Sequence, residues 1–242
     1  PLAASGRQRN SQRFVAPMLT FPINHWSGSE IPINSLRFVA SAATSLRRTP
    51  SVAGNRNLWT WAAWIKRGQL TALQHFWGID TATPDAISFT ATDTLQITIG
   101  GTVRLASTQV FRDPGAWMHV VVAFDAANAV AANKLRVYVN GAEITTWTTD
   151  TRAAIALNQA KTNTAVAHYI GAGGLGATGL DGYMADIYLI DGAALAPTAF
   201  GAFDADGIWQ PGPQYAGAYG TNGFFLDTAT IANGTTPDSG PN

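Results

Sequence analysis

The chain has 242 residues, of which 46% are hydrophobic and only 12% charged, and its formal net charge is zero. This composition predicts a compact protein that buries a sizeable core under a neutral surface. Because the sequence has no cysteine, disulfides, thiolate metal sites and a cysteine nucleophile are excluded. No uninterrupted apolar run reaches about 18 residues, so the sequence predicts no membrane span.

The charge is unevenly divided along the chain. Residues 1–70 contain nine Lys or Arg against Glu30 alone, giving +8, whereas residues 71–242 contain six basic and fourteen acidic residues, giving −8. A basic first segment can dock on an acidic partner. Alternatively, the two ends of a sandwich lie together and the charges cancel across its surface.

Residues 1–34 show no sustained hydrophobic period. Pro17, Pro22 and Pro32 interrupt the segment, because proline breaks helices and removes ladder donors from strands. We predict an extended arm that packs either on its own domain or on a neighbouring subunit, as a possible anchor. The residues expected to anchor such an arm to a partner are Arg7, Arg9, Arg13, Phe14 and Phe21.

Regular structure is expected from residue 35 onward. The predicted strands before the central hairpin cover residues 35–40, 58–66, 74–79, 86–90, 94–99 and 102–107, with a turn-rich link at residues 45–57. In the strand at 58–66, Trp59 and Trp61 fall on one face and Ala62 and Trp64 on the other. Two apolar faces predict a strand in the middle of a sheet that is covered on both sides.

Residues 117–147 carry the clearest pattern. They predict strands at 119–124, 134–139 and 143–147, the last two joined by Asn140-Gly141. An Asn-Gly pair between alternating strands favours a type I′ turn, because both central residues need positive φ. Leu135, Val137 and Val139 lie on one face and polar residues on the other, which here predicts a sheet covered on one side.

The remainder of the chain continues this strand pattern. Strands are expected at residues 165–171, 182–190 and 223–226, with a glycine-rich loop at 171–179 and one helical turn within 194–203. Residues 229–242 have a linker composition. Roughly ten to twelve short strands with almost no helical period predict an all-β fold, a two-sheet antiparallel β-sandwich or jelly roll over residues 35–228.

Three segments carry a family resemblance: residues 117–120 (WMHV), 135–141 (LRVYVNG) and 181–189 (DGYMADIYL). With the Trp-rich strand at 58–66, they resemble laminin-G-like domains of the concanavalin A-like lectin/glucanase superfamily. The stretches SLRRTPSVAGNRNLWTWAAWIKRG, FGAFDADGIWQP and YGTNGFFL further resemble phage-encoded laminin-G-like virion proteins. The resemblance implies a jelly-roll fold and, because one fold serves many functions, no single activity.

Enzymatic chemistry finds little support in the sequence. A glucanase needs two or three carboxylates on one strand, yet the only glutamates are Glu30 and Glu143, and neither lies in such a motif. Asp181, Asp186 and Asp191 are five apart, so a straight strand alternates their faces. No G-x-S-x-G elbow is present, and the neutral charge without a recognition motif argues against nucleic acid binding. No catalytic residue is predicted.

Two kinds of binding site remain as hypotheses. Exposed tryptophan can stack on a sugar ring, although a two-sheet core also uses tryptophan. The candidate sugar-binding residues are Trp26, Trp77, Trp147 and Trp209. The family resemblance implies that a Ca²⁺ ion can sit at the sandwich rim, held by loop oxygens. The candidate Ca²⁺ ligands are Asp80, Asp85, Asp125 and Asp150; no other cofactor is expected.

The main functional hypothesis follows from the phage resemblance. It is a non-enzymatic virion surface protein, as a capsid decoration, tail fibre or spike component, whose partners are capsid or tail subunits. Such a protein is expected to be a homo-oligomer, for which a trimer is one plausible symmetry. The alternative is a carbohydrate-binding module for attachment to a host-surface glycan. A third reading, a glucanase-type glycoside hydrolase, lacks the required carboxylates.

Overall fold

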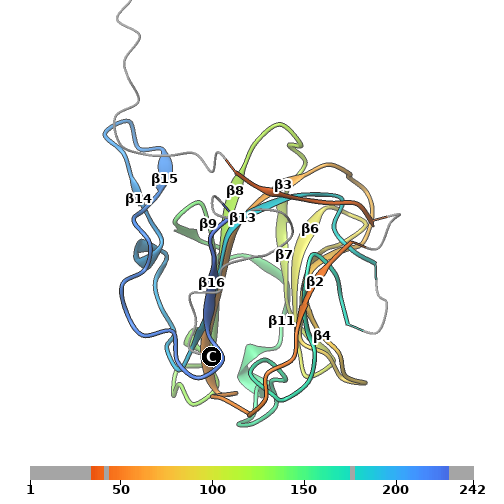
Figure 1. The fold of residues 1–242 in the computed structure, drawn as a ribbon, viewed down its shortest axis with the longest axis vertical. Helices are drawn as coiled ribbons and strands as arrows, with labels where there is room; N and C mark the ends of the chain where they lie inside the picture. Colours follow the sequence, from red (N-terminus) through yellow and green to blue (C-terminus); the bar gives the residue numbers. More distant parts are fainter. Residues whose placement is uncertain (1–33, 41–43, 175–177, 229–242) are drawn as a thin grey trace, which may run out of the picture.

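The computed structural model describes residues 34–40, 44–174 and 178–228. Two antiparallel sheets face each other, with β8, β9, β13 and β16 on one side and β2, β4, β6, β7 and β11 on the other (Figure 1). The predicted two-sheet sandwich is confirmed. The domain boundaries at residues 34/35 and 228/229 stay a prediction, and the anchor candidates Arg7, Arg9, Arg13, Phe14 and Phe21 lie outside the described residues.

The first sheet has the order β1 (Leu36–Phe38), β13 (Gly182–Asp191), β3 (Leu58–Arg67), β8 (Met118–Asp125), β9 (Leu135–Val139) and β10 (Ala142–Glu143), and β16 (Phe224–Leu226) also pairs with β13. The second has the order β11 (Trp147–Asp150), β7 (Thr102–Val110), β6 (Thr94–Ile99), β5 (Ala86–Phe89), β4 (Gln74–Ile79), β12 (His168–Ile170) and β2 (Leu46–Arg48). A small sheet joins β14 (Gly201–Phe203) to β15 (Trp209–Pro211). The described residues also form the 3-10 turns η2 (Ala131–Asn133), η3 (Arg152–Ala154) and η4 (Pro197–Ala199).

Strand β3 organises the first sheet. It lies between β13 and β8, and nearly all of its residues are buried. Trp59 and Trp61 point into the core between the two sheets, whereas Ala62 and Trp64 belong to clusters on the opposite face. The prediction of a central strand covered on both faces is confirmed.

The hairpin turns form as their sequences predict. Asn140 and Gly141 have φ of 49° and 78°, and Gly100 and Gly101 have φ of 59° and 77°. Positive φ at both central residues is the signature of a type I′ turn, whose twist matches that of the flanking strands. These turns fix the registers β9–β10 and β6–β7.

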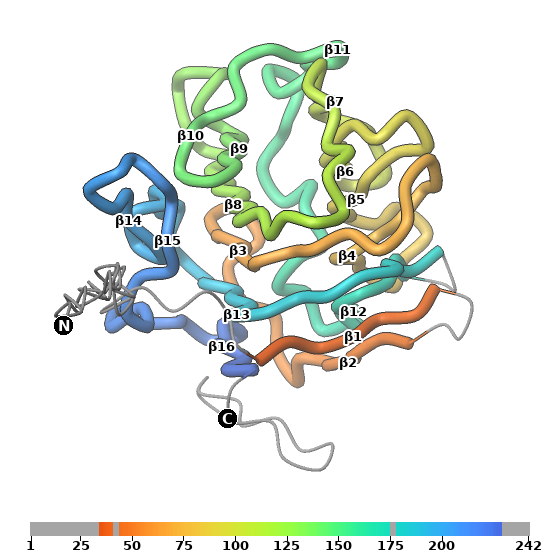
Figure 2. The backbone as a smooth tube through the Cα atoms, turned by 90° about the horizontal axis from the view of Figure 1, so that it is seen from above, coloured from red at the N-terminus to blue at the C-terminus, as the bar shows by residue number. Residues whose placement is uncertain are grey.

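The prediction that the sheet at β9 is covered on one side is wrong. Tyr138, on the face that looks polar in the sequence, is buried in a cluster with Tyr188, Phe200 and Phe225. The chain after β13 folds back over this outer face and is held there by Thr60, whose Oγ1 donates to Ala193 O and accepts from Leu195 N–H, both at 2.8 Å. Figure 2 shows β14 and β15 beyond the first sheet, on the side away from the second.

Two regions differ from the predicted strands for local reasons. The predicted link at residues 45–57 contains β2, whose three residues pair with β12 but are too few to show an alternating pattern. The C-terminal region contains β14 and β15, each also only three residues long. Thr228 Oγ1 donates to Asn34 O at 2.7 Å, so the two ends of the described fold meet. No helix in the described part of the chain has the length and hydropathy to cross a membrane.

Candidate functional site

An aromatic cleft opens where β3, the loop before β8 and β15 meet. Its volume is about 310 Å³, close to the lower end of the size range of small-molecule sites. The lining residues, which define the aromatic cleft below, are Trp64, Gly115, Trp117, Ile208, Trp209, Gln210 and Pro211. None of these seven side chains carries a charge, and the polar groups among them are the indole N–H groups and the Gln210 amide.

The floor of the cleft is a stack of rings on the outer face of the first sheet. Trp64 and His119 are cross-strand partners, and their ring centroids are 5.0 Å apart. The rings of Trp209 and His119 are also nearly parallel, with centroids 6.0 Å apart and an interplanar angle of 18°. Gly141 permits this approach, because a Cβ there would lie 2.3 Å from Trp209 Cε3. The turn glycine of the β9–β10 hairpin therefore also makes room for the cleft.

His119 holds Trp209 in place. Trp209 Nε1 donates to His119 Nδ1 at 3.1 Å, and this bond requires Nδ1 to be an unprotonated acceptor because an indole N–H can only donate. Burial lowers the pKa of His119 to about 3, since an apolar environment disfavours the charged imidazolium. The neutral ring is thus maintained at ordinary pH, and the orientation of Trp209 follows from it.

The hairpin β14–β15 brings Trp209 and Gln210 to the cleft. Asp204 closes its turn: Oδ1 accepts the backbone N–H of Asp206 at 3.0 Å and of Ile208 at 2.9 Å. Gly207 supplies the positive φ of 74° that the turn needs. The second carboxylate oxygen of Asp204 accepts from Gln210 Nε2 at 2.9 Å, which fixes the orientation of the Gln210 amide.

The rim of the cleft leaves apolar surface open. Trp64 and Trp209 are 5% and 6% exposed and form the floor, whereas Trp117 is half-buried. Ile208 is 54% exposed, and Phe203, which meets Trp209 edge-on at 5.0 Å, is 55% exposed. Two exposed apolar side chains and one half-buried indole provide a surface on which a flat apolar ligand face can stack.

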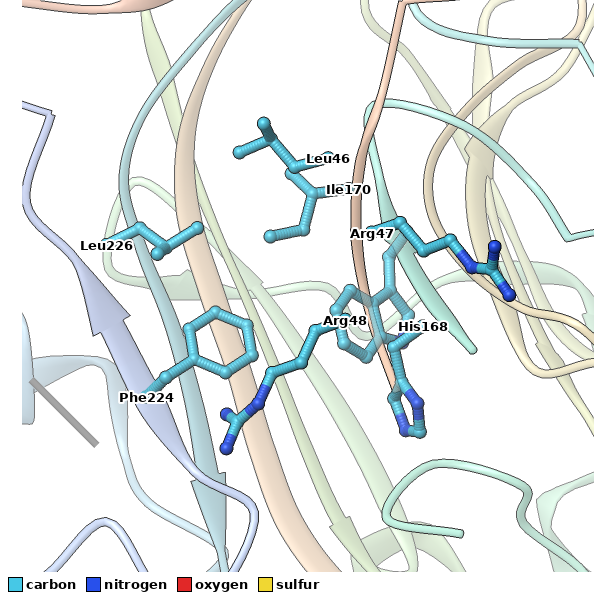
Figure 3. Close-up of a pocket in the computed structure, with 8 residues that line it drawn as sticks. Leu46, Arg47, Arg48, His168, Ile170, Phe224 and Leu226 are labelled. Carbon is cyan, nitrogen blue, oxygen red and sulfur yellow. The ribbon is translucent and has the colours of Figure 1, made fainter. Parts of the chain in front are cut away.

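A second cavity, the edge slot, lies between β2 and β16 at the margins of the two sheets. Its volume is about 290 Å³, and Figure 3 shows most of its lining side chains. The residues that define the edge slot are Leu46, Arg47, Arg48, Trp77, His168, Ile170, Phe224 and Leu226. Arg48 points toward Phe224, over whose ring it lies at 5.6 Å, and its Nη1 donates to Asn222 O at 3.1 Å.

The other polar groups of the edge slot serve the fold. His168 Nε2 accepts the Asn163 N–H at 3.0 Å, and its Nδ1 lies 2.8 Å from Val166 O. Burial is the main cause that lowers the pKa of His168 to about 4. Among the described residues, Trp77 Nε1 has no acceptor, but the Nε1 atoms of Trp59 and Trp61 elsewhere in the core have none either. Nothing here singles out a ligand.

The structure separates the predicted sugar-binding tryptophans. Trp209 lines the aromatic cleft. Trp77 is 1% exposed in the core, so both ring faces are covered and it cannot serve as a stacking platform. Trp147 is partly buried at the far edge of the second sheet, with the guanidinium of Arg152 5.6 Å from its ring. Trp26 lies outside the described residues.

Sequence reasoning missed Trp64, Trp117 and Gln210 as cleft residues. A usable signal existed for Trp64, which is the one tryptophan of its strand on the face opposite Trp59 and Trp61. No sequence signal identifies Gln210 as a lining residue, because its position depends on the turn that begins at Asp204.

The four predicted Ca²⁺ ligands are not brought together. Asp85 accepts the backbone N–H groups of Gly100, Lys161 and Thr162 at 2.6–2.8 Å, and burial raises its pKa. Asp150 is paired with Arg152 at 2.7 Å, Asp125 accepts from Ala127 N–H, and Asp80 accepts from Tyr169 OH. No group of three or more His, Cys, Asp or Glu suited to a metal occurs in the described ranges, so these residues do not fit a shared Ca²⁺ site.

Two of the carboxylates considered for hydrolysis are engaged in ion pairs, and Glu30 lies outside the described residues. Glu143 accepts from Arg136 through both oxygens, at 3.1 and 2.5 Å, and Asp181 is paired with Arg37 at 2.6 Å. No carboxylate is among the residues that line the aromatic cleft or the edge slot. Neither cavity therefore presents the pair of carboxylates that glycoside hydrolysis requires.

Comparison with known proteins identifies the superfamily to which the fold belongs. The family model of the Concanavalin A-like lectin/glucanases superfamily, of laminin-G type, matches residues 41–198. The chain belongs to this superfamily. The resemblance to laminin-G-like domains of this superfamily is thereby confirmed, whereas the resemblance to phage virion proteins stays a prediction, and the fold is of the lectin and carbohydrate-binding type. The search of curated proteins finds no match.

Solved structures agree at the level of the fold. A putative carbohydrate binding protein from Bacteroides ovatus is 16% identical with a TM-score of 0.53, over 81% of this chain and 52% of that one. Domains LG4-5 of the mouse laminin alpha1 chain are 12% identical (TM-score 0.45; 68% and 43% covered). Domain 4 of an extracellular arabinanase from Geobacillus stearothermophilus, solved with arabinotriose, is 18% identical (TM-score 0.44; 64% and 69% covered). Of these three structures, the Bacteroides ovatus protein has a TM-score above 0.5, and at 16% identity it bears on the fold alone.

Proposed function

We propose that this protein is a non-catalytic carbohydrate-binding module that holds a sugar ring in the aromatic cleft. The observation that carries the proposal is the convergence of Trp64, Trp117 and Trp209 on one open, uncharged cleft. Trp117 is the platform, because it is the cleft indole with the most accessible surface. Ile208 and Phe203 extend the apolar contact at the rim.

The physical basis is the two-sided nature of a sugar ring. Its C–H groups form an apolar face that an indole covers, while its hydroxyls need hydrogen-bond partners at the edge. Aromatic packing contributes about 0.5–1.5 kcal/mol beyond the area that it buries, and a few placed polar groups then fix the orientation of a ligand. The aromatic cleft offers indole rings for the apolar face and, among its lining residues, the polar indole N–H groups and Gln210.

Trp117→Ala tests this assignment. Loss of the platform should weaken glycan binding at least about tenfold, equal to about 1.4 kcal/mol, by isothermal titration against ligands first found on a neutral glycan array. The matched control is Tyr169→Ala, which removes a half-exposed aromatic ring from the second sheet and should leave affinity unchanged. Equal affinities for wild type and Trp117→Ala would contradict the assignment.

The virion setting stays a prediction that rests on the sequence resemblance. In that setting the module would attach a particle to a host-surface glycan, with capsid or tail subunits as its partners. Immunogold labelling of purified particles tests this directly. A particle preparation that lacks the chain would remove the virion role and leave the binding proposal unaffected.

A further inference from the structure

Lys66 lies directly beside the aromatic cleft. It follows Trp64 by two residues in β3, so the two side chains stand on the same, outer face of the first sheet. The register of β3 and β8 pairs Ile65 with Met118 and so sets Lys66 opposite Trp117, at a Cβ separation of about 4.5–5.5 Å. The sheet therefore supplies a cation at the margin of the cleft, next to its most accessible indole.

A second ring flanks Lys66 on its other side. The register of β13 and β3 pairs Tyr183 with Lys66, and Tyr183 is 38% exposed. The edge strand β1 continues the series, because Arg37 pairs with Tyr183 and its guanidinium lies 5.1 Å from the Tyr183 ring. Tyr183, Lys66 and Trp117, called the lysine row below, thus lie side by side on the sheet face that bears the cleft.

Lys66 provides the charge of the lysine row. In the part of the chain that the structure describes, no ion pair and no hydrogen bond of Lys66 Nζ is found. Arg37, by contrast, is paired with Asp181 at 2.6 Å. Lys134 Nζ donates to Ile155 O at 2.8 Å. A half-buried ammonium without a protein acceptor is a group with which an anionic ligand can pair.

The carboxylates of β13 and of the loop before it have partners of their own. Asp181, two residues before Tyr183, is the partner of Arg37. Asp186, in the bulge of β13, is also engaged. Neither is found paired with Lys66, so this side of the lysine row does not neutralise the ammonium.

The loop before β8 is close to neutral. Arg112 and Arg67 share the Asp93 carboxylate, at 2.9 and 3.1 Å, so this group of three keeps one positive charge. Asp113 contributes one negative charge, and its Oδ1 accepts two backbone N–H groups of its own turn at 2.8 and 3.2 Å. The charges of this loop therefore balance without Lys66.

The hairpin wall of the cleft bears the opposite charge. Asp204 and Asp206 lie in the β14–β15 turn, next to the lining residue Ile208. The backbone N–H of Ile208, followed by the Gln210 amide, lowers the pKa of Asp204 and keeps it ionised. The cleft thus has a cation on its sheet side and carboxylates on its hairpin side. An anionic ligand group is attracted to Lys66 and repelled by the turn, which sets how the ligand lies.

We infer that the preferred ligand is an acidic sugar, whose ring stacks on Trp117 and whose carboxylate or sulfate group pairs with Lys66 Nζ. The inference rests on the proposed function and adds to it the class of ligand and the residue that selects it. Neutral sugars use the indoles alone and bind the same cleft more weakly. Carboxylate and sulfate both present anionic oxygens to the ammonium, and the test separates them.

The test compares matched ligands on the full chain. The probes are α-1,4- and β-1,4-linked tetrasaccharides of glucose, galactose and mannose, each beside one counterpart with a carboxylate at C6 and one with a sulfate on O6. In isothermal titration at low salt, at least one acidic member should bind about tenfold or more tightly than its neutral counterpart. This ratio should shrink at about 1 M salt, where the Debye length falls to about 3 Å.

Lys66→Met isolates the ammonium. Methionine keeps most of the apolar stem and removes the charge, so acidic and neutral members should bind equally, with the neutral affinity changed by less than about twofold. Lys66→Arg keeps a cationic donor and should keep the preference. The matched control is Lys161→Met, which removes the same charge from the loop between η3 and β12 and should leave the ratio as in wild type.

The results that would overturn the inference can be told apart. If no acidic member binds more tightly than its neutral counterpart, while Trp117→Ala weakens both, the cleft binds sugars without preferring acidic ones. If the preference survives in Lys66→Met, or is lost equally in Lys161→Met, Lys66 is not the selecting residue. If no probe binds, or if Trp117→Ala leaves binding intact, the proposed function fails and the inference fails with it.

Discussion

The aromatic cleft and the edge slot have nearly equal volumes, about 310 and 290 Å³, yet their chemistry differs. The edge slot is the seam between two sheet margins, and the two nitrogens of its histidine are taken up by neighbouring backbone. The aromatic cleft is bordered by the exposed apolar side chains of Ile208 and Phe203, and its lining residue Gln210 has no donor to Oε1 among the described residues. Cavity size alone thus says little about function, whereas the accounting of polar groups separates a packing seam from a binding site.

The two cavities also differ in what their residues contribute to folding. Phe224, Leu226 and Ile170 of the edge slot belong to the main core between the sheets. Trp64 and Trp209 form a small satellite cluster on the outer face, against which Trp117 packs. Substitutions in the edge slot should therefore affect stability more than ligand binding, and substitutions at the cleft rim should do the reverse.

The largest expected effect is that of Phe224→Ala in the edge slot. Removal of this buried ring should lower the free energy of unfolding by about 3–5 kcal/mol, because the fixed margins of the two sheets cannot close the cavity that is left. Urea denaturation measures the change, and titration at low temperature checks that the folded fraction still binds glycan. A loss of affinity in the folded variant would show that the edge slot takes part in recognition.

Acidification should lower the free energy of unfolding through two histidines, His119 beside the aromatic cleft and His168 in the edge slot. The pKa is lowered to about 3 for His119 and about 4 for His168, against about 6.5 in the unfolded chain. Each neutral ring therefore contributes stability that is fully present above about pH 6.5 and lost as the pH falls toward the folded value. The slope is at most about 1.4 kcal/mol per pH unit for each histidine.

His119→Gln isolates the cleft histidine in this pH dependence. Urea titrations between pH 6.5 and 4 should show a slope smaller by up to about 1.4 kcal/mol per unit than in wild type, while His168→Gln gives a similar reduction from the other cavity. In wild type, the glycan affinity of the folded protein should stay constant in the same window, because His119 remains neutral and Nδ1 still accepts from Trp209 until the pH approaches 3. Parallel stability curves for wild type and both variants would contradict the assigned protonation states.

The sequence predicted the scaffold well because the scaffold is local. The alternation in β9 and the turn residues Asn140 and Gly141 specify strands and hairpins within a few residues. The covering of Tyr138 was not predictable in this way, because it depends on Phe200 and Phe225, which are more than sixty residues away in the chain. Burial on the second face of a sheet is a property of the whole topology.

The candidate site was predictable only in part, for the same reason. Aromatic content pointed to Trp209, but nothing local distinguishes it from Trp77, whose position in β4 buries it between the sheets. The cleft joins residues from β3, the loop before β8 and β15, which the sequence holds far apart. The amide of Gln210 takes its orientation only when the turn at Asp204 has formed.

The smallest expected effect is that of Arg47→Ala, a substitution in the edge slot that tests the difference between this cavity and the aromatic cleft. Although Arg47 lines this cavity, its side chain points away from it in Figure 3 and lies over the Tyr169 ring at 5.8 Å. The side chain is solvent-exposed, so the free energy of unfolding should change by less than about 0.5 kcal/mol. Glycan affinity, measured by the same titration, should match wild type, since Arg47 is not among the residues that line the aromatic cleft. A clear loss of affinity in Arg47→Ala would instead mean that a charged group of the edge slot takes part in recognition. The edge slot would then be part of the binding site and not only a packing seam.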